Sequence, residues 1–463
     1  MSKFTPNAGF SRVVWYSAPD NSTVLTKVIG TISAEGGNVA TLEVVERDRD
    51  MIVRELIFDA ASEDQAVAIV KRIADIEGVE ILTDEDRTFL VHEGGKLSVE
   101  RRYPLRDKAD LSMAYTPGVA RVCRAVHMDP ELGFRYTCKR NTVAVVTDGT
   151  AVLGLGDIGP LAGLPVMEGK ALLFKTFGNV DAFPICLDTQ DTEEIIETVK
   201  RIAPGFGGIN LEDISAPRCF EIEKRLVAEL DIPVFHDDQH GTAIVTLAAL
   251  YNALKIVDKK IEDIRVVMNG AGAAGISCSW LLQSAGVRDI TLCDSRGIVS
   301  RDRTDLNNAK RGFAVEESGG LAEACVGRDL FIGVSVPEVL TVEMVQTMAD
   351  KPVVFAMSNP IPEIQPELIQ DIAAVVATGR SDYPNQINNV LAFPGIFRGA
   401  LDCRATAITP AMHRGAARAI ADLIPEDELD PSFIIPAVFD ERVASAVAEA
   451  VMLAAREDGV RRS

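Results

Sequence analysis

The first ninety residues alternate between short apolar runs and segments with helical spacing. Strands are predicted at 12–17, 38–48, 51–60 and 79–84, and helices are predicted at 21–37 and 62–78. In the second helix the apolar residues recur at helical spacing, and Ser62 stands where its side chain can cap the first turn. The predicted order of this unit is β-α-β-β-α-β.

The same segment carries Gly36-Gly37-Asn38 between its first helix and its second strand. Together with the β-α-β-β-α-β order, this resembles the ACT domain. The resemblance implies a ferredoxin-like module at residues 1–92 that binds a small effector or pairs with a second copy. Because such units host many functions, the fold alone assigns no ligand. The mixed-charge stretch 92–112 predicts a connector to a new domain.

The pattern Gly-x-Gly-x-x-Gly occurs twice, at 154–159 and at 270–275, so its context must decide its meaning. The second copy follows a strand-like segment at 264–269, opens an apolar helical segment, and leads to a strand that ends at Asp294. This order predicts a Rossmann-type dinucleotide site. The residues expected to line it are Gly270, Gly272, Ala273, Ala274 and Gly275.

The residues of this turn have separate physical tasks. Gly270 permits the tight turn, Gly272 lets the pyrophosphate approach the backbone, and Gly275 allows close packing of the helix, whose N-terminus stabilises the phosphate charge. Asp294 could bind the ribose diol of NAD. Ser295 and Arg296, which follow at once, could hold the 2′-phosphate of NADP, so both coenzymes remain open.

The first copy, GLGDIG, is followed directly by Pro160 and then by Gly163 and Pro165. These residues predict that no long helix starts here and that no βαβ unit forms. We interpret this copy as a tight glycine turn beside an active site rather than a phosphate cradle, with Asp157 as a supporting polar group.

The stretch VFHDDQHGTAIVTLAAL, at 234–250, places two carboxylates and two imidazoles before a long apolar helix. One aspartate would be enough to cap the helix. The surplus makes a metal or catalytic site worth testing, and three other polar segments offer partners for it: AYTPGVA at 114–120, EGKALLFK at 168–175 and INLEDI at 209–214.

Each of these segments has an ordinary alternative explanation. Tyr115 alone is typical of a packed ring, Lys170 of a surface lysine, and Glu212-Asp213 of a solvated corner. Together they predict a hard-cation site, in which Glu212, Asp213 and Asp238 ligate Mg²⁺ or Mn²⁺ through oxygen. A lysine beside that cation is expected to have a lowered pKa, which would suit a general base.

Composition narrows the class of protein. With 47 basic and 68 acidic residues the net charge is −21, which disfavours nucleic acid and anionic lipid as partners. At 463 residues two or three domains are expected. The stretch 244–257 is too polar to predict a membrane span, and eight scattered cysteines favour reduced thiols in the cytoplasm.

Long motifs then occur in one order from about residue 95 to the end. They are YTPGVA, TDGTAVLGLGDIGPLAGLPVMEGKALLFK, NLEDI, HDDQHGTA, GAGAAG, MSNP and SDYPNQINNVLAFPG. This order resembles the malic enzymes, in the compact bacterial form with an ACT domain in front. The implied fold is α/β, with a malic-enzyme catalytic domain at 93–240 and a Rossmann-type, doubly wound NAD(P)-binding domain with C-terminal helices at 241–463.

The resemblance also implies roles for individual residues. The implied metal ligands are Glu212, Asp213 and Asp238, with Asp237 as their catalytic-site partner. Lys170 is implied as the base and Tyr115 as the acid. Coenzyme or substrate contacts are implied for Asn359, Asn388 and Asn389, and Asn359 also follows a predicted strand at its carboxyl end. Larger relatives grip malate with an arginine where this chain has Thr150-Ala151, which leaves open the cation that holds the second carboxylate.

The implied reaction is the oxidative decarboxylation of L-malate to pyruvate and CO₂ with NAD or NADP, dependent on Mg²⁺ or Mn²⁺. A homodimer or higher homo-oligomer is expected. Two alternatives remain. A metal-independent amino-acid dehydrogenase also pairs a lysine with a Rossmann domain, and a non-catalytic nucleotide or amino-acid sensor would not need Lys170, Tyr115 and three carboxylates together.

Overall fold

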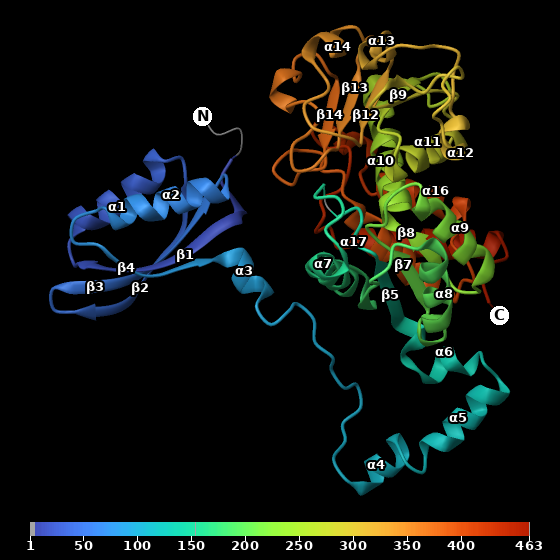
Figure 1. Cartoon of the computed structure of the whole chain (residues 1–463), viewed down its shortest axis with the longest axis horizontal. Coiled ribbons are helices and arrows are strands. Elements are labelled where there is room, and N and C mark those ends of the chain that lie inside the picture. Colours follow the sequence, from blue (N-terminus) through green and yellow to red (C-terminus); the bar gives the residue numbers. More distant parts are fainter. Residues whose placement is uncertain (1–4, 153, 463) are drawn as a thin grey trace. The chain divides into compact units, whose positions relative to one another are not determined.

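The computed structural model describes residues 5–152 and 154–462. It divides into two compact units, Met1–Ser98 and Val99–Ser463 (Figure 1). The boundary lies inside the stretch 92–112 that was predicted as a connector. That stretch is not wholly irregular, because α3 (Arg87–His92) ends where it begins and α4 (Lys108–Ala114) lies near its end.

The first unit has the predicted β-α-β-β-α-β order. Its elements are β1 (Asn7–Pro19), α1 (Ser22–Ala34), β2 (Asn38–Asp48), β3 (Met51–Ala60), α2 (Glu63–Ala74) and β4 (Glu80–Asp86). The strands form an antiparallel sheet in the order β2-β3-β1-β4, and α1 and α2 pack on one face of it (Figure 1). The cap predicted for α2 is confirmed, since the Ser62 side chain accepts a hydrogen bond from the Gln65 N–H.

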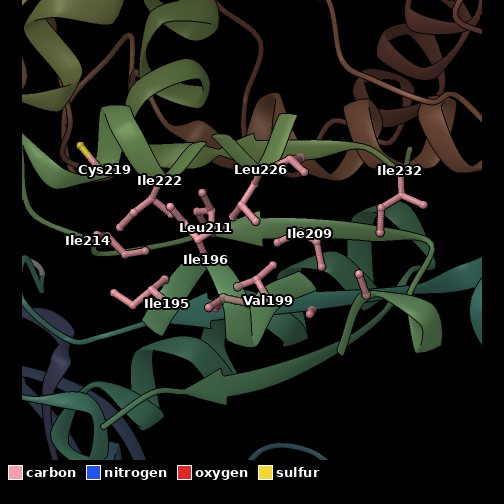
Figure 2. Close-up of a cluster of buried hydrophobic side chains, with 14 of the residues drawn as sticks. Ile195, Ile196, Val199, Ile209, Leu211, Ile214, Cys219, Ile222, Leu226 and Ile232 are labelled. Carbon is pink, nitrogen blue, oxygen red and sulfur yellow. The ribbon is translucent and has the colours of Figure 1, made fainter. Parts of the chain in front are cut away.

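The second unit begins with three helices, α4, α5 (Val119–Met128) and α6 (Leu132–Tyr136), and continues into a parallel sheet. The strands are β5 (Thr142–Thr147), β6 (Asp181–Cys186), β7 (Gly208–Leu211) and β8 (Val234–His236), in the order β6-β5-β7-β8. The connecting helices are α7 (Pro160–Gly178), α8 (Thr192–Ile202) and α9 (Arg218–Glu229). Apolar residues of α8, α9 and the sheet form a shared core (Figure 2).

The second sheet of this unit has six strands in the order β11-β10-β9-β12-β13-β14, parallel except for β10 with β11. The strands are β9 (Arg265–Asn269), β10 (Asp289–Asp294), β11 (Gly297–Ile298), β12 (Leu330–Gly333), β13 (Val353–Ala356) and β14 (Val375–Thr378). The helices that alternate with these strands are α11 (Ala273–Ser284), α12 (Asn308–Arg311), α13 (Leu321–Cys325) and α14 (Val342–Gln346). The C-terminal helices are α15 (Phe393–Asp402), α16 (Pro410–Ala421) and α17 (Arg442–Glu457), of which α15 packs against α7 and α16 packs against α10. The predicted strand, glycine turn, helix and strand are therefore present.

The expectation that no helix follows GLGDIG was wrong. α7 starts at Pro160 and runs for 19 residues, so β5, α7 and β6 form a parallel βαβ unit. Pro160 occupies the first helical position, where an N–H would have no partner inside the helix and the fixed φ of proline suits the helix. Pro165 is accommodated inside the helix.

α10 (Asp237–Val257) joins the two sheets, and by length and composition alone it could cross a membrane. The prediction from residues 244–257 had dismissed a span because of their polar members. The structure gives a firmer reason, because 72% of the most apolar window of α10 is buried inside the unit. α10 packs against α11 and α16 as a core helix.

Candidate active site

Acidic residues collect at the carboxyl ends of three neighbouring parallel strands. Glu212 and Asp213 follow β7, Asp237 and Asp238 follow β8 in the first turn of α10, and Asp148 follows β5. Because β5, β7 and β8 are adjacent and parallel, these ends meet at one edge of the sheet. The fold thus brings together residues that are up to ninety positions apart in the sequence.

Three of these carboxylates form a compact cluster. Glu212, Asp213 and Asp238 each offer one oxygen, and the three oxygens lie within 4.8 Å of one another. The Asp213 N–H donates to Asp238 Oδ2 at 2.8 Å, and Asp213 adopts a left-handed backbone with φ of 53°. Aspartate tolerates this conformation better than most residues, so the tight turn after β7 can present both acidic side chains.

The cluster carries more negative charge than its surroundings balance. Burial and the neighbouring Asp238 carboxylate raise the pKa of Asp213 to about 8. Burial also raises the pKa of Glu212 well above its usual value, although Lys170 opposes the shift. Crowded, buried carboxylates of this kind fit a divalent cation, which removes their mutual repulsion and accepts oxygen ligands.

Lys170 lies in the middle of α7 and reaches this edge of the sheet. Its Nζ lies 2.6 Å from Asp237 Oδ2 and 2.8 Å from Glu212 Oε1, over the ring of Phe393. Burial lowers the pKa of Lys170, but the Asp237 and Glu212 carboxylates outweigh it and raise that pKa above its usual value. The lowered pKa was predicted for a lysine beside a bound cation, so it stays a prediction, and the two carboxylates set the direction in this geometry.

Asp237 is fully buried and is held from two sides. Its Oδ2 accepts from Lys170 and, at 3.0 Å, from Asn389 Nδ2. Asn389 in turn accepts from the Thr242 hydroxyl at 3.2 Å. Asn389 therefore lies at the site as predicted, whereas Asn388 uses its side chain to accept from the Val390 N–H.

Two supporting groups were missed by the sequence analysis. Glu223 of α9 is buried, and its carboxylate accepts from the His236 N–H, from Gln239 Nε2 and from His240 Nε2. These three bonds fix the turn that presents Asp237 and Asp238. No pattern distinguished Glu223 from the other charged residues of α9.

The second missed group joins Asp148 to Arg218. One guanidinium nitrogen of Arg218 lies 2.8 Å from Asp148 Oδ2, and the other donates to Thr150 Oγ1 at 3.1 Å. Thr150 also accepts from the Ser215 N–H, close to Asp213. The structure thus places Arg218 of α9 beside Thr150. Larger relatives were expected to carry an arginine in the sequence itself, at the position of Thr150-Ala151.

The glycine turn after β9 behaves as its spacing predicted. A Cβ at Gly275 would meet the Gly270 carbonyl oxygen at 1.7 Å, so only glycine fits there. A Cβ at Gly272 would meet no protein atom within 4 Å, which leaves room for a ligand at the start of α11, where Ala273 and Ala274 form the first turn.

Asn359 follows β13, and a Cβ at Gly154 would lie 3.3 Å from its carbonyl oxygen. The GLGDIG loop therefore lies against Asn359.

Asp294 ends β10, and its carboxylate oxygens already accept hydrogen bonds from neighbouring residues. Arg303 donates to both of its oxygens at 2.8 and 2.9 Å, Lys310 donates at 2.6 Å, and the Arg296 N–H donates at 2.9 Å. Burial would raise the pKa of Asp294, but these hydrogen bonds outweigh it and hold that pKa well below its usual range. Ser295 follows it at the surface, and the Arg296 guanidinium pairs with Asp305 instead.

Tyr115 is not brought to Lys170 by this fold. Its side chain is 68% exposed, and no contact with the carboxylate cluster is recorded among residues 5–152 and 154–462. It follows α4, which packs chiefly against α5.

Family models match most of the second unit. The malic enzyme N-terminal domain matches residues 94–227, and the malic enzyme NAD-binding domain matches residues 239–456. The chain belongs to the malic enzyme family. Its activity is accordingly the NAD(P)-dependent oxidative decarboxylation of malate, and dependence on a divalent metal ion is typical of the family.

Similar proteins agree with this membership. An NAD-dependent malic enzyme of Geobacillus stearothermophilus is 57% identical over 440 residues, which cover 94% of this chain and 92% of that relative. A bifunctional malic/malolactic enzyme of Bacillus subtilis is 58% identical over 80% of this chain and 92% of its own length. The crystal structure of malic enzyme from Pyrococcus horikoshii superposes with a TM-score of 0.77 at 48% identity, covering 80% of this chain and 88% of that one.

Proposed function

We propose that Glu212, Asp213 and Asp238 hold the divalent cation of the malic enzyme reaction, Mg²⁺ or Mn²⁺. The observation that carries this proposal is the cluster itself, with three carboxylate oxygens within 4.8 Å of one another. Lys170 is the buried base beside four carboxylates, those of Glu212, Asp213, Asp237 and Asp238. A bound cation would supply the positive charge that one lysine cannot. When bound, the ion would act as a Lewis acid on the C2 oxygen and as an electron sink while CO₂ leaves.

Lys170 is the proposed base that takes the C2 hydroxyl proton as hydride passes to the nicotinamide. It lies 2.8 Å from Glu212, a proposed ligand, so a substrate oxygen directed to the cation would come within reach of its Nζ. Asp237 is the proposed orienting partner, because it hydrogen-bonds Lys170 and is itself fixed by Asn389. Tyr115 is the proposed acid that protonates C3.

The proposed coenzyme site is the turn from Gly270 to Gly275, with the first N–H groups of α11 facing the pyrophosphate. Asn359 and Asn389 are proposed to contact the nicotinamide or the substrate carboxylate. Asn388 is kept as a weaker candidate, because its side chain already caps a turn. The domain limits proposed for catalysis and coenzyme binding remain 93–240 and 241–463.

Coenzyme preference is expected to respond to Asp294. A carboxylate accepts about four hydrogen bonds, and Asp294 already accepts four, so the diol of NAD must displace one donor. Asp294→Ala would free Arg303 and Lys310 for a 2′-phosphate. We expect the ratio of KM for NAD to KM for NADP to rise about tenfold, the equivalent of one charge-assisted contact.

The measurement is KM for both coenzymes at saturating malate and Mn²⁺. Arg296→Ala is the matched control, because its guanidinium pairs with Asp305, and it should leave the ratio within about twofold. Equal changes in both KM values in Asp294→Ala would contradict the assignment.

The first unit is proposed to be an ACT-like regulatory or dimerising module that takes a small effector. Its β-α-β-β-α-β order supports this proposal without naming a ligand. We further propose a homo-oligomer in the cytoplasm, a location supported by the eight free cysteines.

Removal of residues 1–98 is expected to leave malate turnover within about twofold of the full chain while abolishing any response to an effector. The reason is that the carboxylate cluster, Lys170 and the glycine turn all lie in the second unit. Rates of both proteins would be compared with and without a panel of amino acids. Complete inactivity of a folded, still oligomeric truncation would mean that the first unit is part of the catalytic core.

The overall proposal is tested by malate-dependent NAD(P)H formation with Mn²⁺, before and after chelation. Loss of the signal on chelation and its recovery with Mn²⁺ are expected. A metal-independent oxidation of an amino acid would favour the alternative dehydrogenase, and binding without turnover would favour the sensor.

A further inference from the structure

Glu363 is a fully buried carboxylate for which the proposed mechanism has no use. Every other carboxylate that is buried in the described part of the chain lies beside a lysine, an arginine or a histidine, or belongs to the proposed metal cluster. No cation pairs with Glu363 within residues 5–152 and 154–462, and backbone N–H groups are its only hydrogen-bond donors there. Burial of an unpaired charge is costly, so the position of Glu363 in the fold needs an explanation.

The hydrogen bonds of Glu363 join the ends of two neighbouring parallel strands, β12 and β13 (Figure 1). Its Oε1 accepts from the Ser335 N–H at 3.1 Å, two residues after β12, and its Oε2 accepts from the Ser358 N–H at 3.0 Å, two residues after β13. Gly333, the last residue of β12, lies against the carboxyl group, because a Cβ there would clash with Glu363 Cδ. The carboxylate is therefore fixed at the carboxyl edge of the sheet.

This edge adjoins the glycine turn after β9. A Cβ at Gly270 would lie 2.7 Å from the carbonyl oxygen of Val334, the residue just before Ser335. Asn269, which ends β9, donates from its Nδ2 to Ser335 Oγ at 2.8 Å. Asn359, a proposed contact of the nicotinamide or the substrate carboxylate, directly follows Ser358 in the chain. Glu363 thus holds two loops that border the proposed coenzyme site.

The order of the strands indicates which half of the coenzyme comes to these loops. Asp294, the proposed partner of the adenosine ribose, ends β10 on one side of β9, whereas β12 and β13 lie on the other side. Ligands of open α/β sheets lie along the carboxyl ends of the strands. A dinucleotide with its pyrophosphate at the turn after β9 therefore extends its nicotinamide half toward the ends of β12 and β13.

The charge of the nicotinamide ring differs between the two forms of the coenzyme. The ring is cationic in NAD⁺ and NADP⁺, and it becomes neutral when the hydride adds to C4, because the two electrons of the hydride form the new C–H bond and remove the ring's positive charge. A fixed negative charge near the ring stabilises the oxidised form and not the reduced one. A buried carboxylate without a cationic partner is suited to this task.

We propose that Glu363 makes the coenzyme site prefer NAD(P)⁺ over NAD(P)H. The proposal rests on the coenzyme site proposed at Gly270–Gly275. Burial raises the pKa of Glu363, while the N–H groups of Ser335 and Ser358 oppose that shift and favour the carboxylate form. The same charge that favours binding of the oxidised coenzyme would favour release of the reduced product, since the ring loses its positive charge as the hydride arrives.

The test is the ratio of two dissociation constants, Kd for NAD⁺ over Kd for NADH, in the full chain with saturating Mn²⁺ and no malate. NADH binding would be followed by its fluorescence, and NAD⁺ binding by competition with NADH. Glu363→Gln keeps the size of the side chain but removes its charge, so the ratio should rise about fivefold. Glu363→Asp keeps the charge, so its ratio should stay within about twofold of wild type even where both affinities fall. Equal changes in both Kd values in Glu363→Gln would mean that Glu363 only ties the loops, and would overturn the proposal.

Glu367→Gln is the matched control, because it removes an exposed carboxylate four residues further along the same segment. Its ratio should equal that of wild type. Gly272→Val separates this proposal from the proposed coenzyme site. Unchanged affinity of Gly272→Val for both coenzymes would overturn the site and this proposal together. Loss of both affinities in Gly272→Val, with an unchanged ratio in Glu363→Gln, would overturn this proposal alone.

A measurement on the wild-type chain keeps the proposal testable if Glu363→Gln does not fold. With saturating Mn²⁺, the wild-type chain is expected to bind NAD⁺ at least as tightly as NADH. Tighter binding of NADH by a factor of about ten or more would overturn the proposal.

Discussion

Asp238→Ala is expected to abolish both malate oxidation and the decarboxylation of supplied oxaloacetate. Both reactions need an electron sink at the C2 oxygen, and Asp238 is one of three carboxylates that would hold the cation. Loss of a charged ligand should weaken Mn²⁺ binding at least tenfold, or about 1.4 kcal/mol. Rates would therefore be measured up to high Mn²⁺ to reveal any rescue.

Thermal unfolding gives a second readout that does not depend on activity. Mn²⁺ at 100 times its Kd should stabilise the wild-type fold by about 2.7 kcal/mol, and Asp238→Ala should lose this effect at the same concentration. Gly272→Val is the matched control, because a Cβ at this position would meet no protein atom within 4 Å while the added side chain would obstruct the pyrophosphate. It should lose malate oxidation while keeping oxaloacetate decarboxylation and the Mn²⁺ stabilisation. Normal Mn²⁺ affinity in Asp238→Ala would contradict the metal assignment and would mean that the HDDQH segment serves only as a helix cap.

Lys170→Met is expected to lower kcat for malate oxidation by about 10²–10⁴-fold, the usual range for loss of a general base. The substitution keeps the length of the side chain but removes the amine that lies between Asp237 and Glu212. Oxaloacetate decarboxylation needs no proton taken from the C2 hydroxyl, so it should fall much less. The ratio of the two rates is the measurement.

Stability must be followed in the same variant. Without Lys170, two buried carboxylates lose their partner, so the metal-free protein should unfold more easily, and saturating Mn²⁺ should restore much of the loss. Lys175→Met, which removes an exposed lysine at the end of the same helix, should leave both rates unchanged. Equal losses in both reactions for a folded Lys170→Met would assign Lys170 to the metal site rather than to proton transfer.

Sequence patterns predicted the structure correctly where the interacting residues lie close together in the chain. The β-α-β-β-α-β order, the Ser62 cap and the strand–glycine–helix unit around Gly272 depend on spacing, capping and backbone freedom, which act over a few residues. The prediction at Pro160 failed for a local reason as well. Proline disrupts a helix only where its N–H is needed, and at the first position it is not.

Other features depended on which strands became neighbours. Lys170 and Asp237 are 67 residues apart, and only the order β5-β7-β8 places them at one edge. Glu223 looks like a surface charge in the sequence, and its burial under the HDDQH turn follows from the packing of α9. The donors to Asp294 come from Arg303 and Lys310, because the loop after β11 folds back.

The sequence by itself determined the family motifs, the element order of the first unit and the carboxylates that crowd one site, because short segments of the chain carry each of these features. The tertiary structure decided which carboxylate pairs with Lys170, which cations engage Asp294, and that Tyr115 stays at the surface of its own chain. Contacts between distant segments are set by the order of strands and the packing of helices, and these arise from the burial of the whole core rather than from any one motif.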